Sequence, residues 1–114
     1  MKWVFTATLF IFLQSQNCNK EKPIRIPGCI QDKIEAIQHL PKYNPPATVR
    51  RYFYLNNYVY LFSSDCCDQL NYVYDKNCNI ICAPNGGISN KGDGRCSNFF
   101  TVATEETLIW QDSR

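Results

Sequence analysis

Seven cysteines in a chain of 114 residues constrain the fold more than any other feature of this sequence. A domain this short buries a thin core, so it often needs covalent support. Cys18 stands apart near the N-terminus, and the other six form an even set suited to disulfides in an oxidising compartment. The pairing stays open, because six cysteines can be connected in many ways. The disulfide candidates are Cys29, Cys66, Cys67, Cys78, Cys82 and Cys96.

Cys18 follows a hydrophobic N-terminal segment. Lys2 precedes an apolar run over residues 3–13, which has the charge and length of a secretory signal peptide and is too short for an ordinary transmembrane helix. The residues before Cys18 lack the usual small-residue cleavage site, but a cysteine directly after such a run is where bacterial lipoproteins are cut and acylated. We therefore expect a signal peptide over residues 1–17 and lipidation of Cys18, which would be the only membrane contact. Secretion without a lipid is the alternative.

Residues 18–28 have the character of a tether, because they are charged, are interrupted by Pro23 and Pro27 and show no periodicity. Loss of the signal peptide removes Lys2 and leaves eleven basic against ten acidic side chains. This near-neutral charge gives no electrostatic argument for nucleic-acid binding. We expect residues 29–114 to form a single, monomeric domain.

The pattern after the tether predicts one amphipathic helix. Ile30, Ile34 and Ile37 recur at helical spacing, Leu40 lies near the same stripe, and Pro41 ends the pattern. The predicted helix therefore covers residues 29–40. It has one apolar face to bury, and its only histidine, His39, stands at its end, where a solvated cation is the ordinary role.

The remaining sequence favours β-strands. Residues 48–55 and 58–62 are rich in aromatic and β-branched side chains and are separated by Asn56-Asn57, a pair suited to a turn with positive φ. A second hairpin is predicted from residues 69–74 and 80–82, and a last short strand from residues 107–110. The expected fold class is α+β, with one N-terminal amphipathic helix packed on an antiparallel sheet of about five strands and stapled by disulfides.

Residues 83–96 contain four of the five glycines in the chain. Asp93 lies between Gly92 and Gly94, and we interpret it as the residue that caps neighbouring amides in a tight turn. A bridge between Cys82 and Cys96 would close this loop. Asp93 is then its one candidate functional side chain.

Candidates for chemistry are few. Asp65 and Asp68 flank the Cys66-Cys67 pair and support the alternative function, a small secreted hydrolase or enzyme inhibitor, but no second catalytic group accompanies them. The cysteine spacing does not match a zinc site, and the glycine-rich segment has too few carboxylates for calcium. We therefore expect no catalytic residue, no metal and no cofactor.

Tyrosines on the first hairpin are the candidate binding residues. Exposed tyrosines are typical of interaction surfaces. In a hairpin that turns at Asn56-Asn57, Tyr58 and Tyr60 share a face with Phe53, and Tyr52 and Tyr54 lie on the other face. We expect one sheet face to pack on the helix and the other to be aromatic and partly solvated, and we expect a protein or glycan partner to bind at this surface. The candidate binding residues are Tyr52, Tyr54, Tyr58, Tyr60 and Asp93.

Three motifs resemble one known family. They are CCDQLNYVYD at residues 66–75, ICAPNGGI at residues 81–88 and KGDGRC at residues 91–96. The chain resembles small lipoproteins and secreted proteins, common in Bacteroidota, that are classed as a domain of unknown function and share CCDQ, YD, ICAPDGGI and GDGKC motifs. The resemblance extends over nearly the whole mature chain, including the closing residues 108–114. It implies a protein of the cell envelope and assigns no activity.

Cys78 departs from that family pattern. The family usually has glycine in this second turn, so a side chain stands where positive φ is expected, at a cost of about 1 kcal/mol. The resemblance also implies that the sixth mature cysteine is an addition to the shared set. Cys78 would then have recruited a cysteine that is otherwise unpaired.

Overall fold

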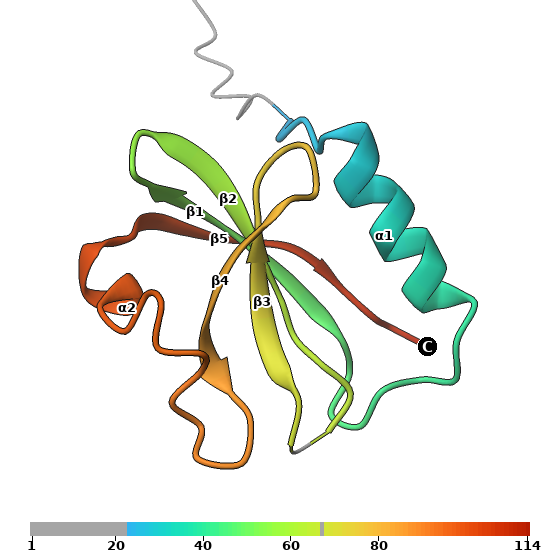
Figure 1. The fold of residues 1–114 in the computed structure, drawn as a ribbon. Coiled ribbons are helices and arrows are strands. Elements are labelled where there is room, and N and C mark those ends of the chain that lie inside the picture. Colours follow the sequence, from blue (N-terminus) through green and yellow to red (C-terminus); the bar gives the residue numbers. More distant parts are fainter. Residues whose placement is uncertain (1–22, 67) are drawn as a thin grey trace, which may run out of the picture.

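The computed structural model describes residues 23–66 and 68–114, and it contains one five-stranded antiparallel sheet and two helices (Figure 1). The predicted signal peptide, the predicted lipidation site Cys18, residues 19–22 of the tether and Cys67 lie outside the described residues. The helices are α1 (Gly28–Gln38) and α2 (Phe99–Val102). The strands are β1 (Thr48–Tyr54), β2 (Asn57–Phe62), β3 (Leu70–Tyr74), β4 (Ile80–Gly86) and β5 (Thr104–Gln111).

The strands lie in the order β4-β3-β2-β1-β5, and all pairs are antiparallel. The predicted α+β class and five-stranded sheet are confirmed. The helix α1 precedes the sheet in the chain but does not begin the described chain, since residues 23–27 come before it. It also ends at Gln38, so Leu40 lies outside the helix and is exposed. The strand β4 runs through Pro84, which an edge strand tolerates because no neighbour needs its N–H.

The first hairpin turns one residue earlier than the sequence predicts. Leu55 and Asn56 occupy the turn with φ of 49° and 65°, and Tyr54 pairs with Asn57. The pairing differs from the expected one by two positions, and side chains alternate with a period of two. Each strand residue therefore keeps its predicted face, and only Leu55 leaves the sheet.

Both faces of the sheet are covered. On one face, Ile30 and Ile34 of α1 pack against Val49, Tyr60 and Phe62. On the other face, α2 and the segment between β4 and α2 cover a second cluster. Figure 1 shows α1 and α2 on opposite sides of the sheet. The members of this second cluster are Tyr52, Tyr54, Val59, Leu61, Val73, Cys82, Cys96 and Phe99. The expectation of a partly solvated aromatic face is therefore corrected.

Two disulfides join distant parts of the chain. Cys29 of α1 bonds to Cys78 in the β3–β4 turn, and Cys82 bonds to Cys96, each with a Cα–Cα distance of 6.0 Å. Cys66 is also disulfide-bonded. Cys78 has a φ of 63°, as the comparison with the family's glycine predicts. Such bonds indicate an extracellular or periplasmic environment. Of the helices that the structure describes, neither has the length and apolar character to cross a bilayer.

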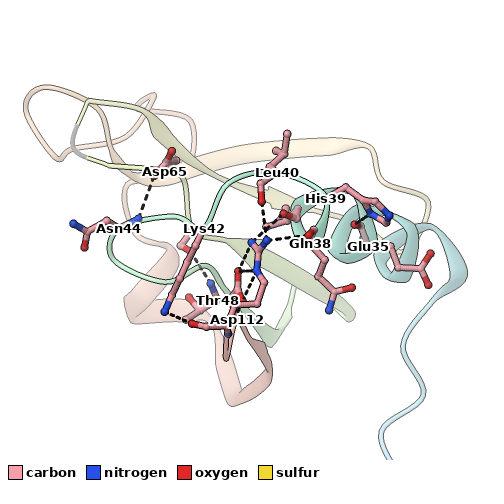
Figure 2. A network of polar contacts seen from close by, with 12 residues as sticks. Glu35, Gln38, His39, Leu40, Lys42, Asn44, Thr48, Asp65 and Asp112 are labelled. Carbon is pink, nitrogen blue, oxygen red and sulfur yellow. Dashed lines mark hydrogen bonds and ion pairs between the residues drawn. The ribbon is translucent and has the colours of Figure 1, made fainter.

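The last residues of the chain hold the end of α1. The guanidinium of Arg114 donates a hydrogen bond to the carbonyl oxygen of Gln38 (2.9 Å), which has no intrahelical partner at the helix end, and another to the carbonyl oxygen of Leu40 (2.7 Å) just beyond the helix. It also pairs with the buried carboxylate of Asp112 at 2.7 Å, and these hydrogen bonds hold the pKa of that carboxyl below its usual range. Figure 2 shows Asp112 beside this end of the helix, close to Lys42. The helix is thus fixed at its start by a disulfide and at its end by this network.

Candidate binding site

The glycine-rich segment is a pinned loop. Gly92 has a φ of 69°, and a Cβ there would lie 1.9 Å from the carbonyl oxygen of Ala83. The Asn90 side chain accepts a hydrogen bond from the N–H of Gly86, and the N–H of Gly92 donates to the Gly86 carbonyl. The loop therefore lies directly against β4, and the Cys82–Cys96 bridge closes it.

Asp93 caps this loop as predicted. Its Oδ1 accepts a hydrogen bond from the Arg95 N–H at 3.0 Å, and its Oδ2 lies 3.2 Å from the Arg95 Nε. Desolvation raises the pKa of Asp93, but the backbone hydrogen bonds of Arg95 and Ala83 and the Arg95 charge outweigh it and lower the pKa. Both carboxylate oxygens contact Arg95 within the loop, so the structure gives Asp93 a structural role.

The four candidate tyrosines do not form one exposed surface. Tyr52, Tyr54 and Tyr60 are buried, with 5%, 9% and 3% of their surface exposed, and they belong to the two cores. Tyr58 is 40% exposed. The aromatic pattern of the hairpin therefore reflects a core on each face of the sheet, and Tyr58 is the tyrosine that a partner can contact.

Tyr58 lines a surface groove, which we call the hairpin groove, with a volume of about 660 Å³. Figure 1 shows the β1–β2 turn and the β3–β4 turn at one end of the sheet, and the groove lies between these two turns and Pro27. Phe53 packs edge-on against Tyr58 at 5.3 Å, and the Arg51 guanidinium lies 4.1 Å from the centre of the Tyr58 ring. Leu55, 68% exposed, stands at its rim.

A second groove lies between α1 and β3, with a volume of about 290 Å³. It is lined by Tyr43, Tyr72 and Tyr74. The Lys33 ammonium lies 4.3 Å above the centre of the Tyr74 ring, so a cation of the chain already covers this face.

A third groove, here called the sheet-face groove, has a volume of about 220 Å³ and lies on the sheet face opposite α1. Its lining is mostly polar. Arg50 and Glu106 form an ion pair at 3.4 Å across β1 and β5. Burial, followed by the interaction of the Tyr52 hydroxyl with the Glu106 carboxylate, raises the pKa of Tyr52 to about 12. The lining residues are Thr48, Arg50, Tyr52, Leu61, Ser63, Asn71, Asn85, Phe100 and Glu106.

The candidates for catalysis are not brought together. Asp65 is exposed and accepts a long hydrogen bond from the Asn44 N–H, at 3.3 Å, and Asp68 is exposed. Neither these carboxylates nor Asp93 line any of the three grooves. His39 is exposed at the helix end, with its Nδ1 2.7 Å from the Glu35 carbonyl oxygen. Among residues 23–66 and 68–114, no three His, Cys, Asp or Glu side chains gather as metal ligands do.

Sequence reasoning missed the polar groups of the sheet-face groove. Arg50, Asn71 and Asn85 come from three different strands, and Phe100 and Glu106 lie before residues 107–110, in a segment for which the sequence predicts no element. The strand alternation puts Arg50 on the same face as Tyr52, so the position of Arg50 could have been predicted from the sequence. The pairing of β5 beside β1, which brings Glu106 to Arg50, has no local signal.

Comparison with known proteins gives a family and no activity. No curated protein and no solved structure is significantly similar to this chain. Residues 35–112, which include the whole sheet and both residues of the Arg50–Glu106 pair, match a family described as "Domain of unknown function (DUF6970)". The chain therefore belongs to the DUF6970 family of domains of unknown function.

Proposed function

We propose that this protein is exported, anchored in the cell envelope through a lipid on Cys18, and acts as a binding module that presents the hairpin groove to a partner protein. The disulfides support the export step, because such bonds persist in oxidising compartments. The signal-like N-terminal sequence and the position of Cys18 support the anchor.

The observation that carries the binding proposal is the exposure of Tyr58 in the hairpin groove. Aromatic side chains in preformed hollows dominate the energetics of protein interfaces. Phe53 and Arg51 hold the Tyr58 ring from two sides, and Leu55 adds exposed apolar surface beside it. The Cys29–Cys78 bridge joins the start of α1 to the β3–β4 turn, so two walls of the groove are covalently connected. The groove therefore loses little conformational freedom when a partner binds.

Site-specific photocrosslinking in cells tests this proposal. A photoreactive phenylalanine analogue at position 58 is expected to give one discrete crosslinked protein. The same analogue at the exposed position Ile88, which lines none of the three grooves, is the control. Leu55→Ser should weaken the crosslink from position 58, because it removes apolar surface from the rim of the groove. Equal crosslinking from both positions would contradict a specific hairpin-groove partner.

The anchor is tested separately. The wild-type chain expressed with its leader should partition into a detergent phase, and Cys18→Ser should move it to the aqueous phase. Aqueous partitioning of the wild type would contradict lipidation while leaving the binding proposal intact.

A further inference from the structure

The sheet-face groove combines donors and acceptors in a way that the fold alone does not require. Arg50 offers only donors and Glu106 only acceptors, and they lie 3.4 Å apart with 41% and 56% of their side-chain surface exposed. Both groups can therefore reach a ligand. Because their charges balance, the groove favours a neutral molecule over an anion or a cation.

A chain of hydrogen bonds fixes the polar floor of the groove. The N–H and the hydroxyl of Ser64 both donate to the Asn71 Oδ1 at 2.8 Å, and the Asn71 Nδ2 donates to the Asn85 Oδ1 at 3.0 Å. In the part of the chain that the structure describes, no hydrogen bond uses the Asn85 Nδ2. The oriented carboxamide of Asn85 thus leaves its donors for a ligand.

An aromatic side chain completes the site. Phe100 is 50% exposed, and its other half packs edge-on against Phe99 at 5.2 Å and Tyr52 at 6.2 Å. An exposed ring held in place by two neighbours loses little freedom when a ligand lies on it. A sugar ring has a flat, weakly polar face, because its hydroxyls point outward around its edge. This face can stack on the Phe100 ring.

The size of the groove limits the ligand. Its volume of about 220 Å³ equals the volume of roughly seven water molecules at ~30 Å³ each, which suits one sugar ring and not a drug-sized ligand. A pair of neighbouring hydroxyls can accept from Arg50 and donate to Glu106 at the same time.

From these observations we propose that the sheet-face groove binds one neutral sugar residue of a glycan, stacked on Phe100 and hydrogen-bonded by Arg50, Glu106 and Asn85. The site lies on the sheet face opposite Tyr58, so it does not depend on the hairpin groove. A protein with both sites would hold a glycan and a partner protein on opposite faces of one sheet.

Titration of the folded, ¹⁵N-labelled mature chain with oligosaccharides tests this inference. The probes are neutral trisaccharides of glucose, mannose, galactose and N-acetylglucosamine, with a galacturonic acid trisaccharide as the acidic comparison. At least one neutral probe should give saturable shifts of the side-chain amide signals of Asn71 and Asn85 and of the backbone signals of residues 99–106. Shifts that centre on Tyr58, stronger binding of the acidic probe, or no saturable shift with any neutral probe would overturn the inference.

Two variants sharpen the result. Phe100→Ala should weaken the affinity for the neutral sugar by roughly two- to tenfold, the usual contribution of an aromatic contact. Val102 is exposed on the same short helix, so Val102→Ala is the control and should leave this affinity unchanged. Glu106→Gln removes the charge that balances Arg50, so the preference should move toward the acidic probe. Unchanged affinities and an unchanged preference in both variants would overturn the site, even if a neutral sugar binds elsewhere.

Discussion

The bridge between Cys29 and Cys78 makes a quantitative prediction about stability. It joins residues 49 positions apart, and the loop-entropy relation assigns a closed loop of that length about 4 kcal/mol of stabilisation. Against that gain, Cys78 holds a φ of 63°, which costs a residue with a Cβ about 1 kcal/mol relative to glycine. The net contribution of Cys78 is therefore the difference between a large unfolded-state effect and a smaller folded-state strain.

Two double variants separate these effects. Cys29→Ser with Cys78→Ser should lower the free energy of unfolding by about 4 kcal/mol, and Cys29→Ser with Cys78→Gly by about 3 kcal/mol, because glycine removes the strain as well as the bridge. Urea unfolding followed by circular dichroism measures both. Cys82→Ser with Cys96→Ser, which opens a loop of 14 positions, is the matched control and should cost about 3 kcal/mol. The reasoning is refuted if the glycine variant is no more stable than the serine variant.

Three further predictions concern single side chains. Leu55→Asn should raise the unfolding free energy by about 0.5–1 kcal/mol, since Leu55 is exposed at a φ of 49° that asparagine tolerates better; a lower urea midpoint would contradict this. Gly94→Ala should cost about 1 kcal/mol, because Gly94 has a φ of 80° and its Cβ would meet nothing. Gly92→Ala should cost clearly more because its Cβ also meets the Ala83 carbonyl, and equal urea midpoints would count against that contact. Tyr52→Phe should abolish one tyrosinate absorbance step near pH 12. Because burial raises the pKa of Tyr52 above the value of 10 in the unfolded chain, the contribution of Tyr52 to stability is complete below pH 10 and is lost as the pH rises toward 12. The variant should lack this loss of stability.

The strand pattern could be predicted because it is local. Side-chain alternation assigned Tyr58 and Tyr60 to one face and Tyr52 and Tyr54 to the other, and a two-position change of pairing left those faces intact. The helix was predictable because Ile30 and Ile34 repeat at helical spacing.

The cover over the second sheet face could not be predicted from the same signals. It is formed by a glycine-rich loop and a helix of four residues, neither of which has a periodic apolar pattern. The loop reaches the sheet because Gly92 permits close contact with Ala83 and because Cys96 bonds to Cys82. These are contacts between segments, so the burial of Tyr52 and Tyr54 under this cover, and the polar groove beside it, become visible only in the folded chain.

The central claim, that this is an exported, disulfide-stapled and lipid-anchored domain, is tested most directly by the intact mass of the protein isolated from its own membrane, before and after reduction and alkylation. We predict a chain that begins at Cys18, carries a lipid-sized increment there, and takes up alkylating reagent at the later cysteines only after reduction. Digestion without reduction should give disulfide-linked peptides that join Cys29 to Cys78 and Cys82 to Cys96. An uncleaved N-terminus, or free thiols at these four cysteines without reduction, would contradict the account.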